Sequence, residues 1–305
     1  MIPADEQLRD GIAVVDKPAG WTSHDVVAKA RGLLRNKKIG HSGTLDPDAT
    51  GVLLLGVGRV TRLLRFLTAL DKTYTGELVL GIETATLDAA GDVVATYDMS
   101  DVDPVAVRAA AHALTGHILQ VPPMVSAVRV GGRRLHELAR AGREVEREPR
   151  PVHVARFGVD PVPAESDVYQ FEVVCSSGTY VRSLAADLGR ALGGGAHLRS
   201  LRRTAIGSFT VDQARTLDDI EVLPAAVAVR DYPSTTVGPD VAVDVGHGKR
   251  VRLDGSVPTS APEIAVLDET GRLLAMYERV DDELARPVVV VAPAEPGSSP
   301  GHAHG

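Results

Sequence analysis

One short segment of the chain could hold a reactive carboxylate in a fixed position. Residues 40–51 read GHSGTLDPDATG, and their three glycines and one proline exclude a regular helix or a central strand. An apolar, strand-like run from Val52 to Val57 follows at once. A loop so constrained, set against a buried strand, would hold Asp46 in a fixed position as a candidate catalytic carboxylate. The same residues could instead form an ordinary tight turn, because Asp and Pro are common turn residues.

The sequence around this loop indicates the elements that would position it. Thr22 and Asp25 have the spacing of a capping box, and apolar Val26, Val27 and Ala30 follow as one face of a helix. Further strands are expected over residues 12–15, 73–81 and 169–173, and further helices over 61–70, 103–116 and 179–192. Strands and helices alternate irregularly, without a repeated βαβ rhythm. This order favours an α+β fold with a mixed, largely antiparallel sheet flanked by helices.

Length and composition bound the class of protein. A chain of 305 residues with 44% hydrophobic residues is long enough for one large domain and a small one. Cys175 is the single cysteine, which excludes an internal disulfide and favours a reducing compartment. Residues 1–10 lack the apolar stretch of a signal peptide, and no run is long enough to cross a bilayer. We therefore expect a soluble, cytoplasmic protein.

The distribution of charge matters more here than the net charge of −7. Residues 16–65 carry nine Lys and Arg against four Asp and Glu, and residues 182–203 carry five against one. Acids dominate elsewhere, with six acids and no base in residues 82–107. Because RNA phosphates respond to local charge, the basic segments are compatible with an RNA partner. Ordinary solvated surface would give the same counts.

The last part of the chain has a different character. From Tyr232 onward the sequence is acidic and rich in short strand-like runs separated by turns. These runs lie at 246–251, 264–267, 273–277 and 288–291. Such spacing is typical of a small β-barrel of about 60 residues. We expect a catalytic domain over 1–231, a small barrel over 232–291, and a disordered tail over 292–305, where Pro, Gly, Ser and His dominate.

Motifs in further segments accompany the loop along the chain. They are DKPAGWTS at 16–23, KTY at 72–74, PMVSA at 123–127, REPRP at 147–151, CSSGTYVRSL at 175–184, GAHL at 195–198 and LRR at 201–203. Together with the loop, which meets every fixed position of G-H-x-G-x-L-D-P-x-A-T-G, they resemble the TruB family of tRNA pseudouridine synthases. The matches fall in order across residues 11–210, so chance agreement of one short motif does not explain them.

The resemblance implies the pseudouridine synthase fold and the isomerisation of one uridine, conventionally numbered 55, in the T-loop of tRNA. It also implies a PUA-like RNA-binding barrel at the C-terminus and binding of tRNA through its T-arm. The reaction breaks the bond from uracil N1 to ribose C1′ and rejoins the base through C5, so no atom is gained or lost. We therefore expect no cofactor, no metal and no membrane partner, and we take a monomer as the default.

The resemblance also assigns roles to individual residues. Asp46 is the expected nucleophile, Arg182 its positively charged partner, and Tyr74 the residue that stacks on a flipped-out base. The other residues expected to contact the substrate are His41, Lys17, Leu201, Tyr180 and Gly43. Plainer alternatives stay open: His41 could simply bind the loop, Lys17 could be a solvated turn residue, and Tyr74 could belong to the core. Attack at C6 of the base and attack at C1′ of the sugar both stay open.

Two other classes of function share part of this pattern. Residues 46–50 also fit D-x-D-x-T, the nucleophile motif of Mg²⁺-dependent haloacid-dehalogenase phosphatases, but that motif should follow an apolar strand. Here residues 41–44 precede it, and Asp92 and Asp98 do not follow an apolar strand as a metal-binding pair should. A non-catalytic tRNA-binding or tRNA-folding chaperone fits the basic segments. It gives no reason for the three expected catalytic residues to occur together.

Overall fold

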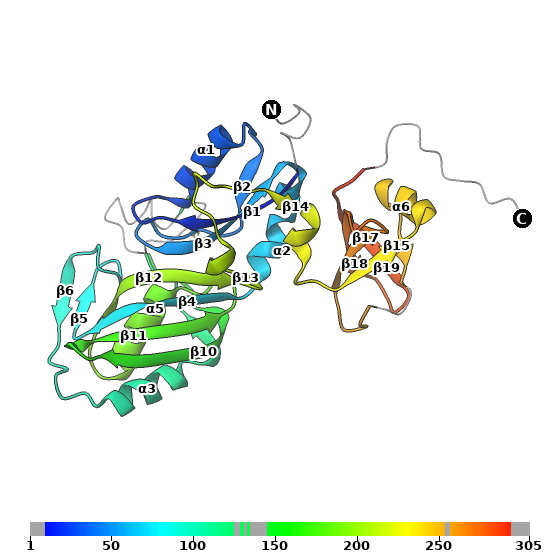
Figure 1. The fold of residues 1–305 in the computed structure, drawn as a ribbon. Helices are drawn as coiled ribbons and strands as arrows, with labels where there is room; N and C mark the ends of the chain where they lie inside the picture. Colours follow the sequence, from blue (N-terminus) through cyan, green and yellow to red (C-terminus); the bar gives the residue numbers. More distant parts are fainter. Residues whose placement is uncertain (1–9, 125–128, 131–132, 135–144, 254–256, 294–305) are drawn as a thin grey trace, which may run out of the picture.

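The computed structural model describes residues 10–124, 129–130, 133–134, 145–253 and 257–293. Its largest sheet contains β1 (Gly11–Lys17), β2 (Ile39–His41), β3 (Thr50–Val57), β4 (Lys72–Leu80), β7 (Gly116–Gln120), β10 (Arg150–Val162), β11 (Glu165–Cys175), β12 (Ala196–Ile206), β13 (Phe209–Thr210) and β14 (Leu223–Pro224). The order is β14-β1-β3-β12-β4-β11-β10-β7, with β2 on β3 and β13 on β12 (Figure 1). Only β3 and β12 pair in parallel within this sheet. The expected α+β fold with a largely antiparallel sheet is confirmed.

Shorter elements and helices complete this part of the chain. They are α1 (Ser23–Leu33), η2 (Gly58–Leu63), α2 (Leu64–Ala69), β5 (Ile82–Thr84), β6 (Val93–Thr96), α3 (Pro104–Ala113), β8 (Arg129–Val130), β9 (Arg133–Arg134), α5 (Val181–Ala191), η3 (Val211–Gln213) and η4 (Ala225–Val229). α1 covers the N-terminal strands, whereas α3 and α5 lie against β10, β11 and β12 (Figure 1). The helix expected over 61–70 divides into η2 and α2.

Local sequence explains where two of these helices begin. At α1 the backbone N–H of Asp25 donates to Thr22 Oγ1, and the backbone N–H of Thr22 donates to the Asp25 carboxylate, which completes the expected capping box. At α3 the Asp103 carboxylate accepts from the backbone N–H of Val105, and Pro104 occupies the first helical position.

The Asp46 loop lies between β2 and β3, where several packed layers meet. Leu45 and Ala49 flank Asp46 and are buried in the same cluster as Leu184 of α5. On the other side of β3, α1 packs its buried face against Leu53 and its neighbours. The loop is therefore held between two hydrophobic clusters rather than suspended in solvent.

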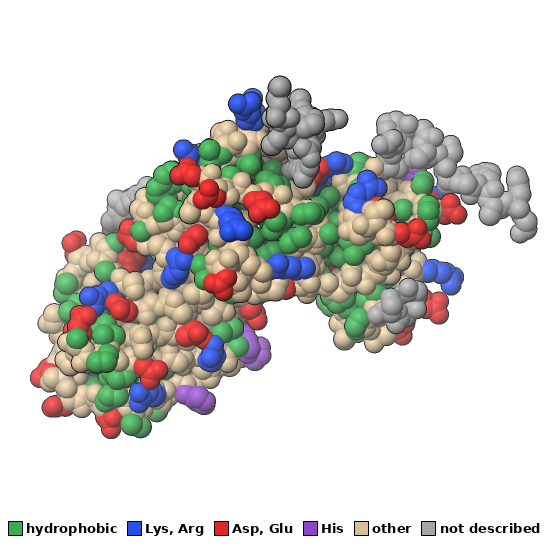
Figure 2. All heavy atoms as spheres, viewed as in Figure 1, with side chains coloured by type: hydrophobic (Ala, Val, Ile, Leu, Met, Phe, Trp, Pro, Cys, Tyr) green, Lys and Arg blue, Asp and Glu red, His purple; other side chains and the backbone are tan. Residues whose placement is uncertain are grey.

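The C-terminal part forms a second sheet. Its elements are β15 (Ser234–Val237), α6 (Pro239–Gly246), β16 (Val251–Arg252), β17 (Glu263–Asp268), β18 (Leu273–Arg279) and β19 (Leu284–Val290). The order β15-β17-β18-β19-β16 gives a curled half-barrel, which is the form that the expected small barrel takes (Figure 1). Ala265 and Met276 of this sheet share a hydrophobic cluster with Phe66 of α2, and Figure 2 shows hydrophobic side chains gathered at this junction.

One strand prediction in this part was wrong. The segment 246–251 was expected to be a strand, but α6 runs to Gly246 and only Val251 and Arg252 join the sheet. Pro239 starts α6, and Gly248, at φ +74°, takes the turn that follows it. Val251 is the one apolar side chain of this segment, and the residues before it form the end of α6 and the turn that follows.

Two expectations about the chain as a whole complete the picture. Within the described residues, no helix has both the length and the apolar character needed to cross a membrane. The tail expected to be disordered over 292–305 lies almost wholly outside the described residues, which end at 293.

Candidate active site

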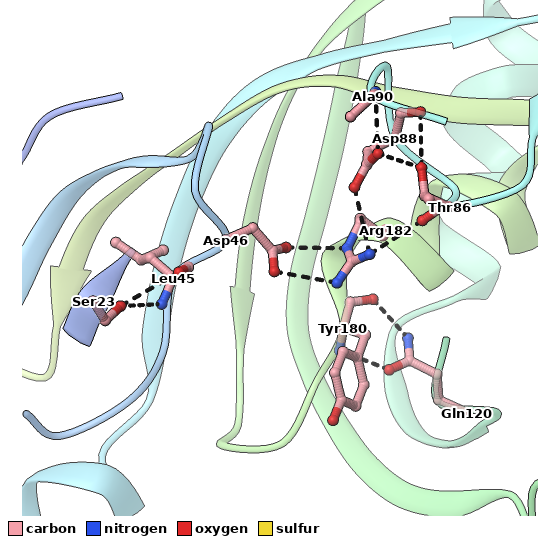
Figure 3. Close-up of polar contacts among 9 residues, drawn as sticks. All are labelled: Ser23, Leu45, Asp46, Thr86, Asp88, Ala90, Gln120, Tyr180 and Arg182. Atoms are coloured by element: carbon pink, nitrogen blue, oxygen red, sulfur yellow. Dashed lines mark hydrogen bonds and ion pairs between the residues drawn. The ribbon is translucent and has the colours of Figure 1, made fainter. Parts of the chain in front are cut away.

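The backbone on both sides of Asp46 is tied to the N-terminal segment of the chain. The backbone N–H of Leu45 donates to Ser23 Oγ at 2.9 Å, and Ser23 Oγ lies 3.3 Å from the carbonyl oxygen of Leu45 (Figure 3). On the other side, the carbonyl oxygen of Pro47 accepts from Lys17 Nζ at 2.8 Å. The residues immediately before and after Asp46 are thus fixed by side chains from β1 and α1.

Gly51 brings the end of the loop against β12, and only glycine fits there. Its φ is +103°, and a Cβ atom would lie 2.1 Å from the carbonyl oxygen of Arg203. This close approach is where β3 and β12 pair in parallel. The third glycine of the loop motif therefore places the loop beside β12.

Arg182 forms a forked ion pair with Asp46. Its Nε lies 3.0 Å from Asp46 Oδ2 and its Nη2 lies 3.2 Å from Asp46 Oδ1 (Figure 3). The Arg182 side chain is 6% exposed and the Asp46 side chain 42% exposed, so the guanidinium binds the carboxylate from the buried side and leaves its other side accessible. Two parallel hydrogen bonds fix the orientation of a carboxylate as well as its charge. The structure thus brings together two residues that the sequence analysis paired.

Opposing effects act on the Asp46 carboxyl. Its pKa is raised overall, because the effect of burial is the largest; the Arg182 guanidinium lowers the pKa and the neighbouring Asp88 raises it again. The group is therefore less well solvated than a surface carboxylate while its anionic form keeps a partner. A weakly solvated, oriented anion suits nucleophilic attack.

Asp88 is a site residue that the sequence analysis did not identify. Its Oδ2 lies 3.4 Å from Arg182 Nη1, while Thr86 Oγ1 and the backbone N–H of Ala90 donate to its Oδ1 (Figure 3). Arg182 Nη1 also donates to the carbonyl oxygen of Thr86 at 3.1 Å. No spacing in the sequence links Asp88 to the Asp46 loop, so only the fold could reveal this contact.

A cavity of about 280 Å³ opens beside the Asp46–Arg182 pair. Tyr74 of β4 and Leu201 of β12, both expected site residues, line it. Its other walls come from residues 42–45, Thr68, Lys72, 176–181 and Arg203. Tyr74 is 9% exposed, and burial raises the pKa of its phenol while Arg203 lowers it. The cavity has room for one extruded nucleobase.

Tyr180 and Gly43 also line this cavity, as expected of substrate contacts. The backbone N–H of Tyr180 donates to Gln120 Oε1 at 2.7 Å, and Gln120 Nε2 donates to the carbonyl oxygen of Tyr180 at 3.1 Å (Figure 3). This exchange anchors the start of α5 and hence Arg182. Sequence reasoning did not identify Gln120, a polar residue that is 2% exposed.

His41 lies beside this cavity rather than in its wall. Its Nδ1 accepts from the backbone N–H of Gly43 at 3.3 Å, and its ring stands edge-on to His24 with centroids 5.3 Å apart. Burial lowers the pKa of His41, and the nearby charges of His24 and Arg203 lower it further. The loop-binding contact proposed as the plainer alternative is therefore present.

Lys17 differs from its expected place. Its side chain is fully buried, and Nζ donates to the carbonyl oxygens of Pro18, Trp21 and Pro47 at 2.9, 2.6 and 2.8 Å. An ammonium with three carbonyl acceptors has no proton left for a substrate. Lys17 is neither a substrate contact nor a solvated turn residue; it supports the Asp46 loop from behind.

Two further buried cations were missed by sequence reasoning. Lys72 is 6% exposed, donates to the carbonyl oxygens of Thr68 and Leu70, and has its pKa lowered by burial to about 8. Arg203 is 1% exposed and donates through Nε to the carbonyl oxygen of Val52 at 2.7 Å. Both lie within motifs of the resemblance, at 72–74 and 201–203, which was the available signal.

The phosphatase alternative does not fit this arrangement. Its nucleophile should directly follow a strand, but β2 ends at His41 and Asp46 lies farther along the loop. Asp48, the second acid of that motif, is exposed, and Asp46 faces Arg182. The match to D-x-D-x-T therefore does not indicate a phosphatase site.

A carboxylate held from behind by a guanidinium and facing a base-sized cavity suits attack on a nucleobase or its sugar. The solved structure titled "Crystal Structure of a Cbf5-Nop10-Gar1 Complex" has the same fold, with a TM-score of 0.72 and 26% identity over 95% of this chain and 88% of that chain.

Sequence comparisons place the chain more narrowly. The TruB family pseudouridylate synthase (N terminal domain) model matches residues 31–181, and the tRNA pseudouridylate synthase B C-terminal domain model matches residues 182–232. The tRNA pseudouridine synthase B of Arthrobacter sp. (strain FB24) is 44% identical over 95% of this chain and 100% of its own length. That of Thermobifida fusca (strain YX) is 46% identical over 93% and 99%. The chain belongs to the TruB family of pseudouridylate synthases.

Proposed function

We propose that this chain isomerises uridine 55 in the T-loop of tRNA to pseudouridine. The observation that carries the proposal is the Asp46–Arg182 pair, whose carboxylate opens into a cavity with room for one base. The relatives named tRNA pseudouridine synthase B, which match along nearly their whole length, support tRNA as the substrate.

The chemistry needs one nucleophile and no added atoms. Asp46 attacks either C6 of the uracil or C1′ of the ribose, the bond from N1 to C1′ breaks, and the base turns. The bond from C5 to C1′ then forms, the proton leaves C5, and N1 regains a proton as the carboxylate is released. Because the product is an isomer of the substrate, the balance calls for no oxidant, reductant or group donor. The role of Arg182 is to orient Asp46 and keep its anionic form stable.

The target base must leave the RNA stack to reach Asp46. In the proposed complex the base lies between the Tyr74 ring and Leu201, which line the same cavity. His41 lies at the side of that cavity, where it would contact the part of the tRNA T-loop that the extruded base leaves. Stacking on an aromatic ring compensates for part of the stacking lost on extrusion.

Docking of the T-arm is assigned to the basic surface of the N-terminal helix and to the second sheet. Exposed basic residues lie on the N-terminal helix and directly after it: Lys29, Arg31, Arg35, Lys37 and Lys38. We divide the chain into a catalytic unit over 1–231 and an RNA-binding unit over 232–291. The enzyme is proposed to act as a monomer in the cytoplasm.

The test is incubation of the protein with an unmodified tRNA transcript, followed by mapping of pseudouridine at single-nucleotide resolution. The wild type should modify position 55 alone, and Asp46→Asn should bind the same transcript with unchanged affinity while forming no product. Turnover by Asp46→Asn would remove Asp46 as the nucleophile. A wild type that binds and refolds tRNA without forming pseudouridine would favour the chaperone instead.

A further inference from the structure

Arg203 links both ends of the Asp46 loop to β12. Its Nε donates to the carbonyl oxygen of Val52 at 2.7 Å, and its Nη2 donates to the carbonyl oxygen of Gly43 at 3.3 Å. Gly43 lies before Asp46 and Val52 lies after it. One side chain therefore spans the loop that carries the proposed nucleophile.

The same guanidinium contacts Tyr74. Arg203 of β12 and Tyr74 of β4 are directly opposite partners in the antiparallel ladder, so their side chains lie on the same face of the sheet. The guanidinium lies close enough to the phenol to lower its pKa, and both side chains line the base cavity. Arg203 is thus shared between the loop of Asp46 and the ring expected to stack on the base.

Burial of the Arg203 guanidinium is unfavourable, because the charge loses its hydration. Arg203 is 1% exposed, and in the described part of the chain it has no carboxylate at ion-pair distance. The other arginines of β12 differ: Arg199 pairs with Glu165 at 2.8 Å and Arg202 pairs with Asp16 at 2.7 Å, both near the surface. A buried cation without a counter-ion destabilises a fold unless its hydrogen bonds offset the desolvation. Beside the base cavity, the planar guanidinium of Arg203 can fix several groups at once, which gives this buried cation a positioning role.

We propose that Arg203 is a positioning residue of this site: it holds the Tyr74 phenol and both ends of the Asp46 loop in one frame, so that an extruded base meets the carboxylate at reacting distance. The inference rests on the proposed function for its kinetic consequences. The contact between Arg203 and Tyr74 can be tested without turnover.

The kinetic test compares Arg203→Lys with Arg202→Lys, a matched change one residue away on the same strand. Arg203→Lys keeps the charge but loses the planar fork, and its single-turnover rate on tRNA should fall about 100-fold, the effect of misplacing reacting groups by about an ångström. Its dissociation constant for tRNA should stay within about threefold of the wild type, because a buried side chain makes no phosphate contact. The Arg202→Lys rate should stay within about threefold of the wild type. An Arg203→Lys rate within threefold of the wild type overturns the proposal.

A double-mutant cycle separates positioning from simple support of the sheet. If Arg203 acts through the phenol, Arg203→Lys and Tyr74→Phe should be strongly non-additive in rate, the double variant losing little more than the worse single variant. Rate losses that multiply as independent effects would mean that Arg203 only supports the fold, and would overturn the proposal.

A titration keeps the contact testable even if the wild type forms no pseudouridine, an outcome that would defeat the proposed function alone. The ionisation of Tyr74 is read from phenolate absorbance as the difference between each protein and its Tyr74→Phe counterpart. Because the Arg203 charge favours phenolate, Arg203→Gln should shift this ionisation to higher pH, whereas Arg203→Lys should keep most of the wild-type value. Where Arg203→Gln does not fold, Arg203→Met takes its place, and the kinetic arms with Arg203→Lys still decide. An unchanged ionisation in the folded uncharged variant overturns the proposal.

Discussion

The catalytic region and the C-terminal sheet use charge in opposite ways. Around the Asp46 loop, Lys17, Lys72, Arg182 and Arg203 are all less than 9% exposed and bind backbone carbonyl oxygens or the Asp46 carboxylate. The C-terminal sheet instead places most of its described cations on the surface; Arg279, which is half-buried and donates to the carbonyl oxygens of Val257, Pro258 and Ala261, is an exception. Among its described residues the ion pairs are Arg272–Asp268, Arg286–Glu278, Lys249–Asp244 and Arg252–Glu283, and their basic side chains are 68%, 60%, 50% and 85% exposed.

The difference shows what each region requires of a charge. A surface ion pair contributes about 0–1 kcal/mol and leaves both side chains free to move in water. A buried cation must satisfy nearly all its donors, and so it fixes whatever it binds. The catalytic region therefore accepts an energetic cost in return for a loop of defined position, and the following changes test that contrast from the largest expected effect to the smallest.

The largest effect is expected at Arg182. Arg182→Lys removes the fork that holds both Asp46 oxygens, and one ammonium cannot replace it. The single-turnover rate of pseudouridine formation should fall about 10²- to 10³-fold, as for the loss of a preorganised donor. Arg190→Lys is the matched control, because Arg190 lies on the same helix, is 59% exposed and pairs with Asp187. A rate for Arg182→Lys within tenfold of the wild type would contradict the assigned role.

Lys17 should affect stability more than any surface lysine. Lys17→Met removes the buried ammonium that binds the carbonyl oxygens of Pro18, Trp21 and Pro47, and the free energy of unfolding in urea should fall by about 2–4 kcal/mol. Lys29→Met, on the exposed side of α1, should change it by less than about 0.5 kcal/mol. Equal effects of the two substitutions would show that the buried ammonium does not fix the loop.

Lys72 should give stability a characteristic pH dependence. Its pKa is lowered from 10.5 to about 8 in the folded protein, so between these values the unfolded chain binds the proton more tightly. The cost of burying the charge is thus fully present at neutral pH and is relieved as pH rises from about 8 toward 10.5. Over that window the wild type should gain roughly 3 kcal/mol of unfolding free energy relative to Lys72→Met. A difference that stays flat from pH 7 to pH 10 would show that the ammonium is not desolvated.

The smallest effect is expected on the C-terminal sheet. Arg286→Gln breaks the ion pair with Glu278, in which both side chains are well exposed. The free energy of unfolding should change by less than about 1 kcal/mol, and the change should shrink further in high salt. A loss above 2 kcal/mol would place this pair among the structural contacts and weaken the contrast between the two regions.

Much of the fold and part of the site could be predicted from the sequence, and the physical reason is locality. Pro47 and Gly51 restrict the backbone through their own sterics, and Thr22 reaches Asp25 within one helical turn. The mixed sheet and the start of α3 followed from the same short-range rules. The resemblance then linked Asp46, Tyr74 and Arg182, and the catalytic role of each stays a prediction.

Tertiary structure alone decided which distant groups meet. Asp88 reaches Arg182, Lys17 reaches Pro47, and Arg203 spans the Asp46 loop because β12 lies between β3 and β4, an order that no local pattern encodes. Whether a lysine is solvated or buried depends on the segments that pack around it in the folded chain. The sequence therefore did not show that Lys17 is buried and donates to three backbone carbonyls. The segment 246–251 was also misjudged from sequence, because its glycines and basic residues carry no clear strand pattern and the end of α6 places most of them in a turn. The sequence by itself determined the backbone restrictions of the Asp46 loop, and the packing of the sheet determined which distant side chains contact that loop.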